Sequence, residues 1–146
     1  MPPSDRFKPI QKIASHRERK AAAALGESLK QREAAQQRLA ELRVYLDEYL
    51  ERFSRAAQNG LSSNQVVEYQ VFISKLDNAS AEQEKIVMQS QADCDLSKAT
   101  WRGRYTKSRA MESAVDRMQE REAKDANRKE QSESDDRSQR PRGEDR

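Results

Sequence analysis

The sequence predicts an all-α fold: a long antiparallel two-helix coiled-coil hairpin with a disordered C-terminal tail. The first observation is composition, because 36% of the residues are charged against 34% hydrophobic, with only 4 Gly and 4 Pro in 146 residues. That balance does not suit a compact globular core. The second is three-and-four apolar spacing over two long stretches, which is typical of coiled coils. The third is a single cluster of turn signals, NGLSSNQ at residues 59–65. The chain is therefore expected to fold back once.

The first expected element is a helix over about residues 9–58, preceded by a flexible N-terminus at residues 1–8. Pro9 suits the first turn of a helix, where a missing N–H is not needed. Glu18 and Arg32 are polar interruptions in the apolar spacing. The remaining seam residues are Ala14, Ala21, Leu25, Ser28, Ala35, Leu39, Leu42, Leu46, Tyr49, Phe53 and Ala56.

The expected turn covers residues 59–62. Asn59 and Gly60 can adopt the left-handed conformation that ends a helix. Ser62 and Gln65 match a capping box, in which each residue bonds the backbone N–H of the other. These signals predict that one helix ends and the next begins here.

The second expected helix spans about residues 63–128, and its seam is longer and more polar in the middle. Pairing the helices about the turn matches residues whose numbers sum to about 122, which places Phe53 beside Tyr69. Residues 129–146 carry no large apolar side chain and are predicted to be a disordered charged tail. The seam residues are Val66, Tyr69, Ile73, Leu76, Ser80, Gln83, Val87, Ser90, Cys94, Ser97, Trp101, Arg104, Ser108, Met111, Val115 and Met118.

Catalytic chemistry is not predicted, because a bare hairpin lacks the concave site that catalysis needs. His16 is the only histidine, and a solvated position on a basic face is a better interpretation than a general base or metal ligand. The sequence contains no phosphate-binding glycine loop and no Cys or His cluster, so we expect neither a cofactor nor a metal. Cys94, the single cysteine, is expected to be a small buried thiol in a reducing compartment. No apolar run is long enough to insert in a bilayer.

A basic belt is predicted at the end of the hairpin away from the turn. No acidic residue occurs between residues 98 and 109, and the register places this segment beside cations of the first helix. The alternative, a solvated helix face without a partner, is equally consistent with the spacing. Nucleic acid could match such a charge, but the acidic turn-proximal half argues against it. The belt consists of Arg17, Arg19, Lys20, Lys98, Arg102, Arg104, Lys107 and Arg109.

An apolar surface is predicted near the turn, where Tyr45, Leu50, Val67 and Phe72 lie off the seam. They widen the apolar stripe beyond what two helices need for packing. Aromatic side chains at a partly wet edge are typical binding anchors. The alternative is that they only thicken a thin two-helix core.

Several stretches closely resemble the FliJ family of flagellar type III export proteins. They are LRVYLDEYLERF at residues 42–53, NGLSSNQVVEYQVFISKLDNA at residues 59–79, and the basic segment around Trp101. The resemblance extends from about residue 10 to residue 122. It implies a non-enzymatic coiled coil similar to the central stalk of rotary ATPases.

The resemblance also implies partners and a location. These are the flagellar export ATPase ring, the membrane export gate protein and export chaperones, at the cytoplasmic face of the inner membrane at the flagellar base. The basic belt would face the ATPase. Arg38 and Gln83 would flank the gate-binding surface, called here the aromatic patch, which consists of Leu42, Tyr45, Tyr49, Phe72, Leu76 and Ala79.

Two other interpretations stay open at this point. The chain could be the equivalent stalk of a virulence type III secretion system, which would share the hairpin architecture. It could also be a generic coiled-coil scaffold or a basic nucleic-acid binder.

Overall fold

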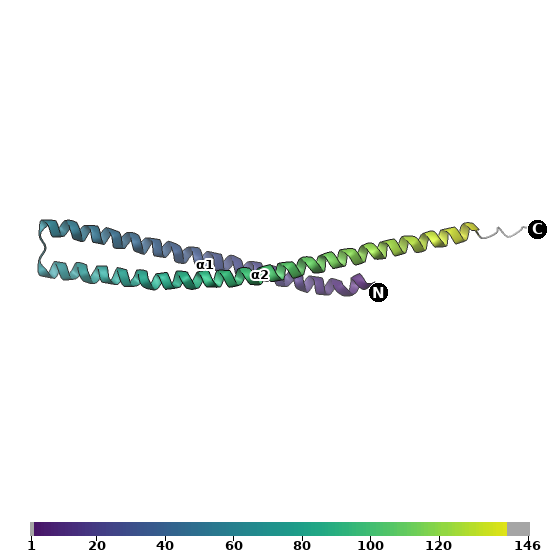
Figure 1. Cartoon of the computed structure of the whole chain (residues 1–146), viewed down its shortest axis with the longest axis horizontal. Helices are drawn as coiled ribbons and strands as arrows, with labels where there is room; N and C mark the ends of the chain where they lie inside the picture. Colours follow the sequence, from purple (N-terminus) through teal and green to yellow (C-terminus); the bar gives the residue numbers. More distant parts are fainter. Residues whose placement is uncertain (1, 140–146) are drawn as a thin grey trace, which may run out of the picture. The chain divides into compact units, whose positions relative to one another are not determined.

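The computed structural model describes residues 2–139, and this part of the chain forms two α-helices. Helix α1 spans Pro3–Asn59 and helix α2 spans Ser63–Gln139. The two helices pack against each other as a hairpin, with the connecting turn at one end (Figure 1). The predicted all-α hairpin is confirmed.

The hairpin divides into two compact units, and both helices run through both of them. The turn unit consists of Ala21–Trp101. The terminal unit consists of Met1–Lys20 together with Arg102–Arg146. Each unit is described by itself below.

The turn forms where the sequence predicts, except that Asn59 is the last residue of α1 and does not take the left-handed conformation. Gly60 has a φ of +91°, and its N–H donates to the carbonyl of Ala57 at 3.3 Å. The N–H of Ser62 donates to Oε1 of Gln65 at 3.0 Å, and the N–H of Gln65 donates to Oγ of Ser62 at 3.3 Å. Both bonds of the capping box are therefore present, and they satisfy N–H groups that the start of α2 leaves without a helical partner.

The predicted seam holds the turn unit together. Every seam residue predicted between Ala21 and Trp101 is buried or half-buried. The rings of Phe53 and Tyr69 lie with their centroids 5.4 Å apart, which confirms the predicted register. Since apolar spacing decides which stripe of each helix leaves water, the sequence was sufficient to identify these residues.

Polar contacts occupy the middle of this seam. The Ser28 and Ser97 hydroxyls lie 3.0 Å apart, and Sγ of Cys94 donates to the Ser28 carbonyl at 3.0 Å. Cys94 is only 1% exposed, as a buried thiol should be. Gln83 is also buried, and its side-chain amide donates to the carbonyl of Ala35 at 3.0 Å. These bonds join α1 to α2 at defined positions along the hairpin.

In the terminal unit, helix α1 begins earlier than the sequence predicts. Residues 3–8, expected to be flexible, are the first turns of α1. Ser4 is buried, and its N–H and hydroxyl donate to the two carboxylate oxygens of Glu122 at 2.9 and 2.6 Å. This pair of bonds anchors the N-terminus on α2. Pro3 takes the first-turn position assigned to Pro9, which instead lies inside the helix.

Helix α2 also continues past its expected end at residue 128. It ends at Gln139, so residues 129–139 are helical rather than disordered. They contain no Gly or Pro, and many are good helix formers. All the side chains from residue 123 to residue 139 are exposed, consistent with a segment that cannot bury itself. The rest of the expected tail, residues 140–146, lies outside the described residues.

Candidate protein-binding sites

The aromatic patch lies entirely within the turn unit, and its six residues differ in exposure. Leu42, Tyr49, Leu76 and Ala79 are half-buried. Tyr45 is 54% exposed and Phe72 is 41% exposed. The patch therefore combines three seam residues and Ala79 with two aromatic rings that solvent reaches.

Tyr49 and Phe72 join the patch across the two helices. Their ring centroids lie 4.3 Å apart with the planes tilted by 41°. The guanidinium of Arg52 lies 5.1 Å from the centroid of the Tyr49 ring, within range of a cation–π interaction. These three residues, with Gln65, Glu68 and Tyr69, line a hollow between α1 and α2. An incoming side chain would meet a preformed aromatic wall there.

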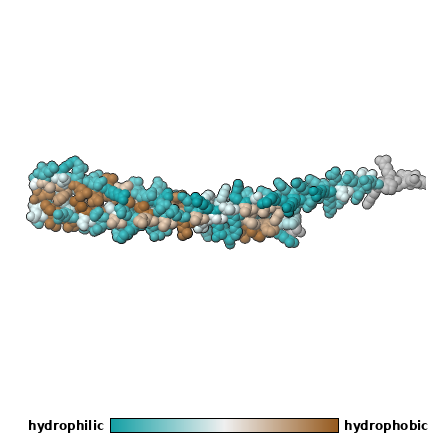
Figure 2. All heavy atoms as spheres, in the orientation of Figure 1, coloured by the Kyte–Doolittle hydropathy of each residue, from teal (hydrophilic) through white to brown (hydrophobic). Residues whose placement is uncertain are grey.

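Apolar exposure near the turn extends beyond the predicted patch. Val44 and Val71, which the sequence analysis did not single out, are about half exposed, as are Leu50 and Val67. Figure 2 shows a broad hydrophobic area over the turn end of both helices. The exposure of Tyr45, Leu50, Val67 and Phe72 argues against a role limited to thickening the core.

Arg52 is a further residue that the sequence analysis missed. It lies outside the seam, and charged residues occur throughout this chain, so its type and spacing alone do not mark it. Its position over Tyr49 is visible only once the helix is built. A cation three residues after an exposed-edge tyrosine on a predicted helix is the signal that could have identified it.

The structure brings only part of the basic belt together. In the terminal unit, Arg17, Arg104 and Lys107 line one hollow. Arg109 pairs with Glu112 at 3.4 Å and lies 5.9 Å from the Tyr105 ring centroid. Lys20 and Arg102 are exposed in the same unit. Lys98 is half-buried and belongs to the turn unit, so the belt is divided between two units.

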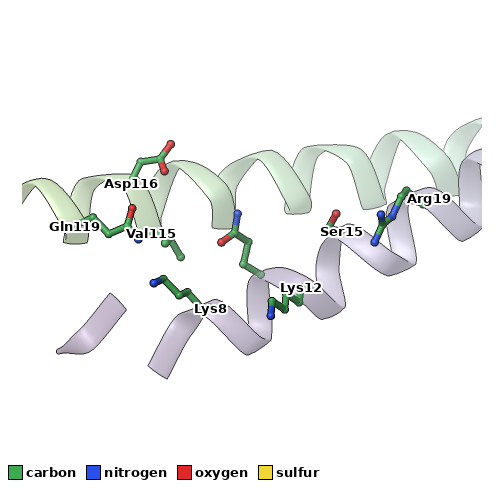
Figure 3. A pocket seen from close by; sticks show the side chains of 8 residues that line it. Lys8, Lys12, Ser15, Arg19, Val115, Asp116 and Gln119 are labelled. Atoms are coloured by element: carbon green, nitrogen blue, oxygen red, sulfur yellow. The ribbon is translucent and has the colours of Figure 1, made fainter. Parts of the chain in front are cut away.

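Arg19 lines a different hollow of the terminal unit. Lys8, Lys12, Ser15 and Arg19 project from α1 there, and Asp116 and Gln119 project from α2 (Figure 3). Lys8 also forms an ion pair with Asp5 at 3.4 Å. Val115 is the one aliphatic residue of the lining, and the lining includes the carboxylate of Asp116.

Among residues 2–139, no group of three or more His, Cys, Asp or Glu side chains is placed to hold a metal ion. Over the same residues, no helix is long and apolar enough to cross a membrane. His16 is exposed on α1.

Two long helices packed against each other and joined by one turn define a coiled-coil hairpin protein. The family described as Flagellar FliJ protein matches residues 3–142, almost the whole chain, and the chain belongs to that family. A comparison with curated proteins gave no match. Family membership makes this chain a structural component of the flagellar export apparatus. The flagellar match favours this assignment over the virulence-type stalk.

Proposed function

We propose that this chain is the stalk-like subunit of the flagellar export apparatus, binding the export ATPase ring, the membrane export gate and export chaperones. The observation that carries the proposal is the family match over residues 3–142 on a chain that folds as one helical hairpin. A hairpin of this kind resembles the central stalk of a rotary ATPase, and it acts by contact rather than by chemistry. Its working position is the cytoplasmic face of the inner membrane at the flagellar base.

The aromatic patch is the proposed gate-binding surface. Tyr45 and Phe72 supply exposed ring surface, and the Tyr49 and Phe72 rings are held against each other before binding. Large, rigid aromatic groups lose little conformational entropy on binding, which is why they dominate interface energies. Arg38 and Gln83 flank the patch, but they differ in character: Arg38 is exposed, whereas Gln83 is buried against Ala35. Gln83 therefore serves the hairpin, and Arg38 is available to a partner.

The basic belt is the proposed ATPase-binding surface. Its exposed cations in the terminal unit would attract an acidic surface and speed association. That attraction would weaken with salt, since charges are screened over about 10 Å at 0.1 M salt. The gate-binding and ATPase-binding surfaces are therefore of different chemistry, one aromatic and one ionic.

Both helices run through the turn unit and the terminal unit, so both binding surfaces are built on the same two elements. A protein that contacts ATPase and gate can bias one partner according to the state of the other, provided that its contacts differ between states. We infer that the chain promotes ring assembly and couples ATP turnover to gate activation in this way.

The test is ATP hydrolysis by the purified cognate export ATPase with and without the full chain, alongside particle imaging of rings. Stimulated turnover with more closed rings is the expected result. No effect on either readout, with circular dichroism showing a folded helical chain, would overturn the stalk proposal. Strong, salt-dependent binding to random duplex DNA in that case would favour a nucleic-acid role instead.

A further inference from the structure

We propose that the terminal unit carries an acceptor groove for an acidic amphipathic helix, built around two exposed isoleucines. The isoleucine groove consists of Ile10, Ile13, Ala14 and Arg17 on α1 and Arg104 and Lys107 on α2. All six residues belong to the same compact unit. The inference deepens the proposed function, because three of the six residues are belt cations.

Ile10 and Ile13 are exposed apolar residues. Neither the packing of the two helices nor the solubility of the chain requires isoleucine at these positions. Ile10 is 46% exposed and Ile13 is 53% exposed, and both lie off the seam. Their neighbour on the seam, Ala14, is buried. Burying the two isoleucines under a partner would remove their apolar surface from water, which favours association. They are apolar anchors without a cover among the described residues.

The groove has walls on both helices and a small residue between them. Ala14 leaves room where a larger seam residue would fill the space, and Arg104 and Lys107 form the facing wall. The cavity volume is about 50 Å³, enough for the tip of one aliphatic side chain and too small for a nucleotide. Such a shape accepts a side chain from a macromolecule rather than a free cofactor.

The charges around the groove determine which kind of apolar partner is complementary to it. Arg17, Arg104 and Lys107 surround the isoleucines, and the structure gives these three no ion pair within residues 2–139. A partner must therefore present an apolar group flanked by carboxylates. An amphipathic helix does so, because residues three and four apart share a face and acidic residues can flank that stripe on both sides.

The other hollow of the terminal unit has a lining less suited to an acidic amphipathic helix. The hollow that includes Lys8, Lys12 and Arg19 contains Asp116 and a polar lining (Figure 3). It lacks exposed isoleucines and places a carboxylate where an acidic partner would be repelled. Of these two hollows, only the isoleucine groove combines apolar anchors with cations and no carboxylate.

The experiment measures binding of a fluorescent helical peptide to the full chain by anisotropy. The peptide is ~18 residues long, with Leu at three-and-four spacing and Glu on both flanks; a scrambled peptide of identical composition is its control. We expect the amphipathic peptide to bind at least tenfold more tightly than the scrambled one. Ile10→Ala with Ile13→Ala should remove that difference. Leu96→Ala with Met88→Ala, at exposed apolar positions of the turn unit, should retain it.

Three outcomes would overturn the proposal: equal binding of the two peptides, retention of the preference by the isoleucine variant, or preferential binding of anionic phosphatidylserine vesicles that the peptide does not displace. Circular dichroism of each variant confirms that the hairpin is folded. The assay contains no ATPase, so its failure is distinct from failure of the proposed function. Absent peptide preference with intact ATPase stimulation would remove the groove alone.

Discussion

Gly60 carries the left-handed conformation on which the turn depends. A Cβ added there would meet nothing within 4 Å, so any penalty for substitution comes from the backbone and not from a clash. Gly60→Ala should therefore destabilise the hairpin by about 1–2 kcal/mol, the cost of placing an L-residue in this region. Thermal unfolding followed by circular dichroism measures the effect.

Gly26 supplies the matched control for that substitution. It lies within α1, and an added Cβ there also meets nothing within 4 Å. Gly26→Ala should stabilise the chain by about 0.5–1 kcal/mol, because alanine loses less backbone entropy in a helix. If both substitutions shift the unfolding midpoint in the same direction, conformation at Gly60 is not what matters.

Substitutions at Tyr45 and Tyr49 distinguish an effect on partner binding from an effect on hairpin stability within the aromatic patch. Tyr45 is mostly exposed, so Tyr45→Ala should weaken binding to the gate protein's cytoplasmic domain at least tenfold while helicity stays unchanged. Tyr49 is half-buried against Phe72, so Tyr49→Ala should weaken binding and also lower the unfolding midpoint. Calorimetric titration and circular dichroism provide the two readouts. Unchanged affinity of the Tyr45 variant would remove the patch from the gate interface.

Arg32, a polar side chain in the seam of the turn unit, has a buried nitrogen that forms no hydrogen bond within residues 2–139. Arg32 donates to Oε1 of Gln91 at a long 3.4 Å, and its Nε is buried without a hydrogen bond among the described residues. An unpaired buried polar group costs about 1–3 kcal/mol. Arg32→Leu should therefore raise the free energy of unfolding by about 1 kcal/mol, measured by urea denaturation.

Arg38 on the same helix is the control for Arg32, because it is exposed and off the seam. Arg38→Leu should leave the free energy of unfolding nearly unchanged. A loss of stability in the Arg32 variant would show that the guanidinium stabilises the native hairpin.

At the scale of the elements, the start of α1 depends on α2. Ser4 donates twice to Glu122, and hydrogen bonds to a charged acceptor contribute about 1.5–3 kcal/mol each. Glu122→Ala should release the first turns of α1, so amide hydrogen exchange of residues 4–8 should accelerate about tenfold or more. Glu120→Ala, an exposed neighbour, should have no such effect. Mass spectrometry resolves the exchange by segment, and unchanged exchange would mean that helix propensity alone orders this end.

At the scale of the whole molecule, 28 cations nearly balance 25 anions, so local clustering matters more than the net charge of +3. The belt concentrates cations in the terminal unit, whereas the aromatic patch belongs to the turn unit. Interactions of these two surfaces should therefore respond differently to salt.

Stimulation of the export ATPase provides the test of that difference. Lys20→Glu with Arg102→Glu, two exposed belt cations outside the isoleucine groove, should reduce stimulation several-fold at low salt and less at high salt. Tyr45→Ala with Phe72→Ala should leave stimulation intact. Equal stimulation by the charge variant and the original chain at every salt concentration would exclude the belt from ATPase binding.

The sequence by itself determined the two helices, the turn between them, the seam residues and the register. These follow from local chemistry: three-and-four apolar spacing selects the buried stripe, and Gly60, Ser62 and Gln65 encode the reversal. Spacing also identified Tyr45 and Phe72 as aromatic residues outside the seam, whereas the six-residue patch is what the family resemblance implies.

Only the tertiary structure decided the features that depend on contacts between distant residues. Ser4 donates to Glu122 across the two helices, and residues 3–8 are helical although the sequence suggested a flexible start. The division of the belt and the grouping of Ile10 and Ile13 with cations of α2 are likewise tertiary, whereas Arg52 and Tyr49 lie three residues apart on α1. The physical reason is that spacing along one helix predicts its own faces, whereas a groove is made by two helices and exists only once they are packed together.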